Sequence, residues 1–399
     1  MPRTKTLVIV LAGGAGGRLR GLTEGRAKPA VPFGGTHRLI DFPLSNAHNS
    51  GLTDVWVVQQ YNPMSLSDHL ANGRPWDLDR TQGGLMLLHP RLGEGGGWHT
   101  GTADSLWRNA GLIREFAPDH LVVLSADAVY LMDYVAIVDE HRDTDADITM
   151  VTTEVGRDDA GRYGVVQADD NNGRITDYTY KPDEPAGNVV ATEVFVMNAA
   201  PILDLLEELG SDADEEEGLG DLGDDLLPRL ADEGRARASR FDRYWRDVGT
   251  VGAYWEAHMD LLKTPPPIDL DDASWPLLTR GGRRPAARLL RGADVRDAMV
   301  AAAATVSGTV EHSVLGTGVV VEEGAVVRDA VLLDGVQVRR GATVQRAVID
   351  EQVEVGADAV IGEADGDPDD VTLVGRGRRV SPGERLHGDE AEQPAERDD

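Results

Sequence analysis

A glycine-rich segment near the N-terminus carries residue types that bind phosphate groups. It reads Leu11-Ala-Gly-Gly-Ala-Gly-Gly-Arg18-Leu19 and continues an apolar run. Glycines that follow a buried strand let backbone N–H groups approach phosphate oxygens closely. The glycines placed for this role are Gly13, Gly14 and Gly16. Arg18 and Lys28 would add positive charge. No Gly-Lys-Ser/Thr follows, so the segment is not a P-loop. A glycine-rich turn alone also occurs in proteins without a phosphate ligand.

The charge distribution along the chain also suggests small anions as ligands. The 399-residue chain has a formal net charge of −30, which disfavours nucleic-acid binding and attachment to an anionic membrane. Within residues 1–38, however, basic side chains dominate and Glu24 is the single acid. This segment suggests a site for small anions, although chance clustering on a solvated surface would give the same composition.

Composition excludes several kinds of site. Cysteine is absent, which excludes disulfides, cysteine-ligated metals and a thiol nucleophile. The ten histidines show no spacing typical of a zinc site. No apolar run is long enough to cross a bilayer, and the run Leu7–Ala12 is too short for a signal-peptide core. We therefore expect a soluble, cytoplasmic protein.

Residues 1–262 alternate between the patterns of buried strands and helices. The predicted strands are Leu7–Ala12, Asp54–Gln60, Leu121–Ser125, Ile148–Glu154, Tyr163–Ala168 and Val189–Met197. The predicted helices are Ala103–Phe116, Asp133–His141, Ala200–Leu209 and Val251–Leu262. This alternation predicts an α/β domain with a mostly parallel sheet and helices on both faces. Ligands of such sheets bind at the carboxyl ends of the strands, where the glycine-rich segment and Asp127 stand.

The remaining residues change character twice. Residues 263–291 are predicted to be a linker, with three prolines at 265–267 followed by a basic patch. In residues 292–380 helical patterning is absent, and valine, glycine and alanine dominate. The segment Ser211–Asp225 is predicted to be an acidic surface loop, and residues 381–399 an acidic, disordered tail.

A six-residue period in residues 292–380 predicts a left-handed parallel β-helix. The apolar residues at this spacing are Val314, Val320, Val326, Leu332, Val338 and Val344. After Val344 the phase slips by one residue, to Ile349, Val355 and Ile361. An antiparallel β-domain would require apolar residues at positions that hold Gly316, Gly318, Glu322 and Gly324. The period and the turn glycines therefore favour the β-helix.

Motifs spread over nearly the whole chain resemble one enzyme family. They are Leu11–Leu19, Arg26–Gly35, Arg38–Phe42, Leu44–Asn46, Asn49–Gly51, Gly101–Asp104, Ser125–Asp127, Tyr163-Gly164, Lys181-Pro182 and Tyr244–Thr250, together with the six-residue repeats. In combination they resemble the glucose-1-phosphate adenylyltransferases, which make ADP-glucose. The resemblance implies a nucleotidyltransferase domain of dinucleotide-binding type in residues 1–262, followed by the β-helix.

The resemblance also implies a reaction and roles for particular residues. An oxygen of a sugar 1-phosphate attacks the α-phosphorus of ATP and releases pyrophosphate, for glycogen or α-glucan synthesis. Asp127 and Asp247 would bind Mg²⁺, and the catalytic group would comprise Arg18, Lys28 and Asp127. The implied substrate-binding residues are Gly13, Gly14, Gly16, His99, Gly101, Gly164 and Lys181. A homotetramer, or a hetero-oligomer with a paralogue, is implied as well. From the residues alone, Asp127 could instead cap a turn, and Asp247 could pair with Arg246.

The sequence departs from the family pattern mainly in the sugar pocket. The family's Glu-Lys pair reads Tyr180-Lys181, and its Ser-Met-Gly reads Ala191-Thr192-Glu193. Three further departures lie elsewhere: Gly17 replaces a threonine, Ala126-Asp127-Ala128 replaces Gly-Asp-His, and His99-Thr100 replaces Tyr-Arg. Residues for phosphate and metal remain, whereas those for glucose do not. Gly25 replaces an effector-binding lysine, so we do not expect activation by sugar bisphosphates.

Three hypotheses follow from this pattern. The chain is an ADP-glucose synthase with an unusual pocket, a nucleotidyltransferase for another sugar phosphate or nucleotide, or a catalytically weak regulatory subunit. Retention of Arg18, Lys28, Asp127 and Asp247 favours the two enzymes over the regulatory subunit. The altered sugar pocket separates the first hypothesis from the second.

Overall fold

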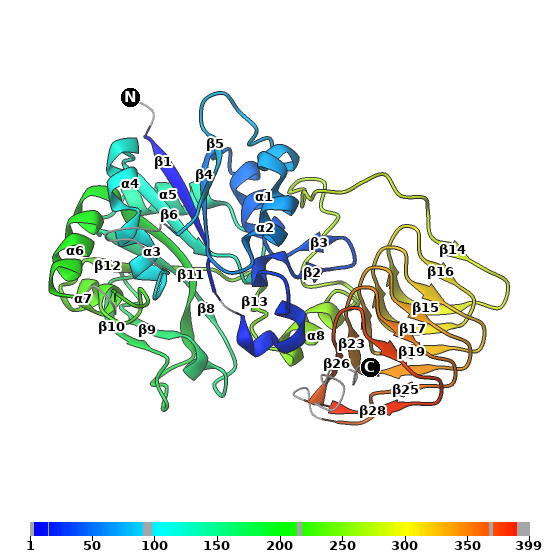
Figure 1. Ribbon diagram of the computed structural model, residues 1–399. Helices are drawn as coiled ribbons and strands as arrows, with labels where there is room; N and C mark the ends of the chain where they lie inside the picture. The colour runs from blue at the N-terminus through cyan, green and yellow to red at the C-terminus, as the bar shows by residue number, and fades with distance from the viewer. Residues whose placement is uncertain (1–3, 15, 91–97, 214–217, 367–369, 389–399) are drawn as a thin grey trace.

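The computed structural model describes residues 4–14, 16–90, 98–213, 218–366 and 370–388. An α/β part and a stack of short parallel strands lie side by side (Figure 1). The stack occupies the C-terminal part from β14 (Arg288–Leu289) onward, coloured yellow to red, and α8 (Val251–Asp260) lies between it and the α/β part. None of the helices in the described ranges combines the length and apolar character needed to cross a membrane.

A mixed sheet forms the centre of the α/β part. Its strands run in the order β10-β9-β11-β6-β1-β4-β5, and β8 and β12 join through β11. The bounds are β1 (Thr6–Ala12), β4 (Asp54–Gln59), β5 (Gly84–Leu88), β6 (His120–Ser125), β8 (Ile148–Glu154), β9 (Gly164–Ala168), β10 (Ile175–Tyr180), β11 (Val189–Asn198) and β12 (Ala236–Arg240). Each strand predicted from the sequence is present to within one residue at either end.

The sheet is less parallel than the sequence predicted. β1 pairs in parallel with β4 and β6, and β4 with β5. However, β11 runs antiparallel to β6, β8 and β9, and β10 runs antiparallel to β9. For β9, β10 and β11 the physical reason is their short connections, which join antiparallel strands far more readily than parallel ones.

Helices cover both faces of this sheet, as predicted. Alternate residues of β1 belong to two hydrophobic cores: Leu7 and Ile9 face one, and Val8 and Val10 face the other. The bounds are α1 (Asp41–Asn49), α2 (Pro63–Leu70), α3 (Thr102–Arg108), α4 (Ala110–Phe116), α5 (Tyr134–Arg142), α6 (Ala199–Asp212) and α7 (Leu226–Asp232). Four short 3-10 helices are η1 (Gly17–Thr23), η2 (Lys28–Ala30), η3 (Ala71–Trp76) and η4 (Ala160–Arg162). The helix predicted over Ala103–Phe116 is divided at Asn109 into α3 and α4.

The C-terminal part is a parallel β-helix. Its strands are β14 (Arg288–Leu289), β15 (Asp294–Val300), β16 (Thr305–Val306), β17 (Thr309–Leu315), β18 (Val320–Val321), β19 (Val326–Arg328), β20 (Val331–Leu332), β21 (Gln337–Val338), β22 (Thr343–Gln345), β23 (Ala347–Ile349), β24 (Glu354–Val355), β25 (Val360–Ile361), β26 (Thr372–Val374), β27 (Arg379–Val380) and β28 (Arg385–Leu386). Every pairing among them is parallel.

The predicted phase of the six-residue period was wrong in the first coils. Val321 pairs with Val338, and Val338 with Val355, so one coil takes 17 residues, one fewer than three six-residue sides. The inward-facing residues in this stretch are Leu315, Val321, Val327, Leu332, Val338, Val344, Ile349, Val355 and Ile361. Val320 and Val326 are only half-buried. The error arose because apolar residues stand side by side at these corners, so the sequence alone did not fix which one faces inward.

The limits of the β-helix also differ from those predicted. β14 lies inside the predicted linker and pairs with β16, so the first coil begins before residue 292. At the other end β28 pairs with β25, beyond residue 380. Of the predicted acidic tail, residues 389–399 lie outside the described residues.

A shared apolar core joins the β-helix to the α/β part. Val314, Val331 and Val348 point out of successive coils and pack in one cluster with Leu19 and Phe33. Trp255 of α8 donates a hydrogen bond from Nε1 to the backbone oxygen of Asp329, at 2.7 Å. The buried guanidinium of Arg26 pairs with Asp350 of the β-helix. The loop that leads to Lys28 is therefore held against the C-terminal part.

Candidate functional site

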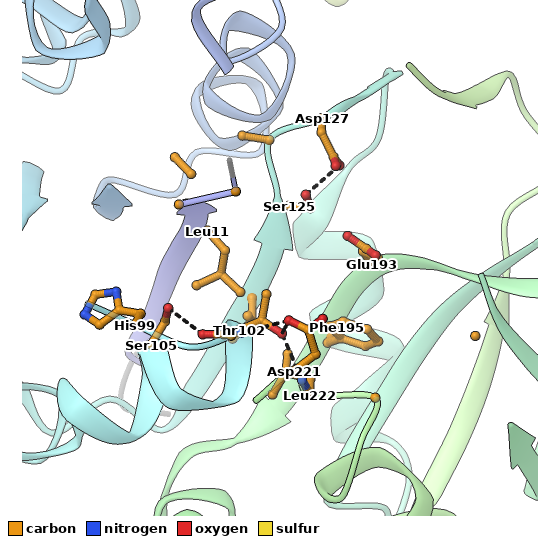
Figure 2. A pocket seen from close by; sticks show the side chains of 18 of the residues that line it. Leu11, His99, Thr102, Ser105, Ser125, Asp127, Glu193, Phe195, Asp221 and Leu222 are labelled. Atoms are coloured by element: carbon orange, nitrogen blue, oxygen red, sulfur yellow. Dashed lines mark hydrogen bonds between the residues drawn. The ribbon is translucent and has the colours of Figure 1, made fainter. Parts of the chain in front are cut away.

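The glycine-rich segment and the ends of the central strands enclose a cavity of about 370 Å³. It lies at the carboxyl ends of β1 and β6, where parallel strands present their loops. Figure 2 shows Ser125 and Asp127 at one end of the cavity, and Thr102, Asp221 and Leu222 at the other. Residues from distant parts of the chain, including Lys28, His99, Gly164 and Lys181, contribute to its walls.

Lys28 stands between the two aspartates expected to bind metal. Its ammonium nitrogen lies 2.9 Å from Oδ2 of Asp127 and 3.8 Å from Oδ1 of Asp247. Asp127 follows β6 directly, and Ser125 donates a hydrogen bond to its Oδ1 at 2.5 Å. Asp247 ends β13 (Trp245–Asp247), which pairs with β7 (Ala128–Tyr130) and places Asp247 opposite the residue after Asp127. Two short strands therefore bring together acids that are far apart in sequence.

Burial and charge pull the pKa values of this cluster in opposite directions. Burial lowers the pKa of Lys28, but Asp127 and Asp247 outweigh burial and raise it above its ordinary value. Burial favours a high pKa for Asp127, but Lys28 and the hydrogen bond from Ser125 hold it below the usual range. For Asp247, burial and repulsion from Asp127 prevail over Lys28, so its pKa is raised. The cluster thus contains a charged lysine against at least one ionised carboxylate.

Further positive charge lies around Asp247. Arg162 of η4 approaches its Oδ2 to 3.6 Å through Nη2. A Cβ added to Gly249 would lie 2.7 Å from the Asp247 carboxylate and 3.4 Å from the Arg18 guanidinium, so Arg18 reaches the same place from the glycine-rich segment. Arg18 is exposed and lines the cavity. Both guanidinium groups are available for anionic oxygens near this carboxylate.

The opposite end of the cavity is held by a network around Asp221. The Tyr180 hydroxyl donates a hydrogen bond to Oδ2 of Asp221 at 2.9 Å. The backbone N–H and the hydroxyl of Thr102, at the start of α3, donate to Oδ1 at 3.0 and 3.2 Å. Lys181 donates from Nζ to the Tyr180 hydroxyl at 2.5 Å and lies over its ring. Both carboxylate oxygens of Asp221 are therefore held by hydrogen bonds from Tyr180 and Thr102.

The segment predicted to be a surface loop contributes this wall. Residues 218–225 pack against α3, with Leu219 and Leu222 buried, so for these residues the prediction was wrong. Residues 214–217 of that prediction lie outside the described residues. A Cβ on Gly101 would lie 2.0 Å from the backbone of Gly220, so only glycine lets the two segments meet. Sequence reasoning missed Asp221 because this contact is not local.

Gly164 lines the cavity and lies against Tyr178. A Cβ at this position would lie 2.3 Å from the hydroxyl of Tyr178, so a side chain here would require Tyr178 to move. His99 is held by Gln60, whose amide donates to the His99 carbonyl and accepts from its N–H, at 3.0 and 2.7 Å. Burial lowers the pKa of His99. Gln60, which sequence reasoning also missed, lines the cavity beside it.

The structure brings most of the predicted site residues to this one cavity. Those that line it are Gly13, Gly14, Arg18, Lys28, His99, Gly101, Asp127, Gly164 and Lys181. Asp247 joins them through Lys28. Gly16 has φ 67°, and a Cβ there would lie 2.8 Å from the side chain of Thr23 and 3.1 Å from that of Lys28. It is not one of the lining residues, and its contact with a substrate stays a prediction.

Glu193 is the feature of the cavity least expected in a site for anions. It lies on β11 between Ala191 and Phe195, which also line the cavity, and Figure 2 shows it between Asp127 and Phe195. Burial raises its pKa to about 8, and Asp127 and Asp247 add to the rise against the opposing effect of Lys181 and Lys28. A carboxylate with this environment is poorly compensated by positive charge.

The two aspartates fit a hard divalent cation. Carboxylate oxygens are the ligands that Mg²⁺ prefers, and the ion is commonly held by one or two carboxylates together with waters and substrate phosphates. The Lys28 ammonium lies beside both aspartates, so the two carboxylates already accommodate a positive charge between them. Over the described ranges, no group of three or more acids and histidines is arranged to hold a metal by itself. A cation here would therefore depend on ligand oxygens from a substrate.

Comparison with known proteins gives two family matches. The family described as Nucleotidyl transferase matches residues 7–264, and the family described as GlmU-like, C-terminal hexapeptide matches residues 285–374. Curated relatives in Bacillus thuringiensis (strain Al Hakam), Bacillus cereus (strain ATCC 10987 / NRS 248) and Bacillus anthracis are named glucose-1-phosphate adenylyltransferase. Each is 38% identical over 330 residues, covering 82% of this chain and 87% of the relative.

Proposed function

Since the chain belongs to the nucleotidyl transferase family, we propose that it transfers the adenylyl group of ATP to α-D-glucose 1-phosphate, giving ADP-glucose and pyrophosphate. The observation that carries this proposal is the cluster of Lys28, Asp127 and Asp247 beside the glycine-rich turn. The names of the relatives support ATP and glucose 1-phosphate as the first substrates to test.

The triphosphate fits the end of the cavity formed by the glycine-rich segment. Gly13 and Gly14 offer an approach free of side chains, and Arg18 and Lys28 offer positive charge to phosphate oxygens. Lys181, at the other end, is the residue we assign to the phosphate of the acceptor. The acceptor's sugar would then lie against Tyr180, Asp221 and Phe195.

The transfer requires positioning and charge neutralisation rather than a covalent catalyst. An oxygen of the acceptor phosphate forms a bond to the α-phosphorus, while the bond from that phosphorus to the oxygen bridging to the β-phosphorus breaks. The electron pair of the broken bond leaves with pyrophosphate. Lys28 and Arg18 stabilise the negative charge that develops on the phosphate oxygens. When bound by Asp127 and Asp247, Mg²⁺ would supply further neutralisation of the triphosphate.

A second candidate is the same transfer to another sugar 1-phosphate. Glu193 and Tyr180 favour it, because they replace a glycine and a glutamate that the family uses around glucose. The regulatory-subunit hypothesis is less well supported, because both acids and both basic residues of the cluster are retained.

The homotetramer implied by the resemblance stays a prediction, which light scattering of the full chain tests directly.

A pyrophosphate-release screen tests the proposal. Nucleoside triphosphates are combined one by one with sugar 1-phosphates in the presence of Mg²⁺. The proposal expects release that requires ATP, an acceptor and the metal together. Release with another triphosphate would replace the adenylyl assignment, and absence of release with every pair would favour the regulatory subunit.

A further inference from the structure

Glu193 is a carboxylate in the cavity for which the proposed transfer has no use. The phosphate of the acceptor is already ionised at neutral pH, so the reaction requires no general base at this position. Ala191 and Phe195, its neighbours on the same face of β11, are both apolar. The carboxyl group at residue 193 therefore requires its own explanation.

The backbone of β11 delivers this side chain into the cavity at a conformational cost. Glu193 has φ 58°, in the left-handed region that side chains other than those of glycine and asparagine rarely adopt. The pairing of β11 with β8 shifts register between Ala191 and Phe195, which is the mark of a bulge. Bulges commonly re-aim one side chain beside a functional site, and strained residues persist where function requires them.

Lys28 and Lys181 act on the Glu193 carboxyl group through their charge, but neither pairs with it directly. The ammonium of Lys28 is engaged by Asp127 at 2.9 Å, and that of Lys181 by the Tyr180 hydroxyl at 2.5 Å. Within the part of the chain that the structure describes, the Glu193 carboxylate has neither a hydrogen bond nor an ion pair. With its pKa raised to about 8, the free side chain is mostly protonated near pH 7, and a ligand that brings positive charge would favour its ionised form.

The substrates limit what that positive charge can be. The triphosphate and the acceptor phosphate are both anionic and would increase the repulsion. Glu193 does not form a metal-binding group with Asp127 and Asp247 in the described residues. Mg²⁺ held by Asp127 and Asp247 would be shared with phosphate oxygens. A positive charge that belongs to the acceptor would come from its sugar part, and the cation that a sugar carries is an ammonium group.

We propose, resting on the proposed function, that Glu193 selects an amino sugar 1-phosphate by pairing its carboxylate with the ammonium group of the acceptor. Asp221 does not take this role, because Tyr180 and Thr102 already occupy its oxygens. Lys181 still binds the acceptor phosphate. The negative phosphate would therefore pair with Lys181, and the positive ammonium group with Glu193. Glucose 1-phosphate remains a substrate, but a poorer one, because it leaves Glu193 unpaired.

The test compares D-glucosamine 1-phosphate and D-galactosamine 1-phosphate with their neutral counterparts, glucose 1-phosphate and galactose 1-phosphate. For the full-length protein we expect kcat/KM to be higher for at least one amino sugar by about tenfold to a hundredfold, the scale of a charged hydrogen bond. Glu193→Gln should reduce that ratio to near one. Glu193→Gly should do the same while relieving the strained backbone. Glu184→Gln, which removes an equal charge from an exposed position outside the cavity, should leave the ratio unchanged.

The outcomes separate this inference from the proposed function. If no acceptor releases pyrophosphate, the proposed function fails. If glucose 1-phosphate and galactose 1-phosphate are used as well as their amino counterparts, transfer stands and the role of Glu193 is wrong. The inference also fails if Glu193→Gln and Glu193→Gly retain the amino-sugar preference of the unmodified chain.

Discussion

The ammonium nitrogen of Lys28 lies 2.9 Å from Oδ2 of Asp127, in a place where burial lowers the pKa of the lysine and the two nearby aspartates raise it. The aspartates keep the lysine charged, and Lys28 in turn keeps Asp127 ionised. Lys28 thus presents a charged group at the end of β6 before any substrate binds. Groups arranged in advance around the place where charge develops are the usual source of rate acceleration in transfers of this kind.

Lys28→Ala should lower kcat/KM for ATP by about tenfold to a hundredfold, because a hydrogen bond to a charged group is lost from the bound triphosphate and from the transition state. Steady-state kinetics measure this. Lys263→Ala, which removes an exposed lysine shortly after the end of α8, is the matched control. An unchanged kcat/KM in the Lys28 variant would remove this residue from the triphosphate site.

Asp127→Asn and Asp247→Asn should each reduce turnover with Mg²⁺ by about a hundredfold or more, since loss of a metal ligand removes several kcal/mol of charge stabilisation. The isosteric amides keep the packing, so circular dichroism spectra should match those of the unmodified chain. Chelation of the metal should abolish turnover in the unmodified chain. If either variant turns over normally with Mg²⁺, that aspartate does not hold the cation.

Tyr180→Phe should weaken acceptor binding while leaving ATP almost unaffected. The change removes the hydroxyl that donates a hydrogen bond to Asp221 and accepts one from Lys181, both at the sugar end of the cavity. The expected result is a rise in KM for the sugar 1-phosphate of about tenfold, the scale of one charged hydrogen bond. Equal changes in both KM values would show that the network supports the whole fold and not the acceptor end.

Stability should fall in acid through His258, which is fully buried on α8. Its Nδ1 donates to the Tyr254 carbonyl at 2.8 Å and its Nε2 accepts from the N–H of Gly34 at 3.1 Å, which requires the neutral ring. Burial lowers its pKa to about 4, below the value of about 6.5 in an unfolded chain. The unfolded state therefore binds the proton first, and stability is lost as pH falls from about 6.5 to about 4, by about 3 kcal/mol.

Urea titrations at several pH values measure this effect. His258→Gln should lose this part of the pH dependence, whereas His89→Gln, at an exposed position, should retain it. The same pH dependence in the His258 variant and the unmodified chain would contradict the assignment.

The sequence was most informative where local patterns decide the structure. Apolar runs bounded by turns located β1 and β6, and their carboxyl ends placed the glycine-rich turn and Asp127 at one edge. Asp247 was placed only by resemblance, since β13 is three residues long and is fixed by its pairing with β7. Asp221 depended on the close approach of Gly101 and Gly220, which no local pattern reveals. The phase of the β-helix was ambiguous because Val320 and Val321 are both valine and differ only in which one the coil turns inward.

Transfer of a nucleotidyl group with release of pyrophosphate is the central activity proposed for this protein. Phosphorus NMR of the full chain with ATP, a sugar 1-phosphate and Mg²⁺ follows every phosphate in one sample. We expect the acceptor signal and the triphosphate signals to decrease together, while a nucleoside diphosphate sugar and pyrophosphate appear in equal amounts. Asp127→Asn should show neither product. Formation of ADP and inorganic phosphate, or unchanged spectra with every acceptor tested, would contradict the proposed function.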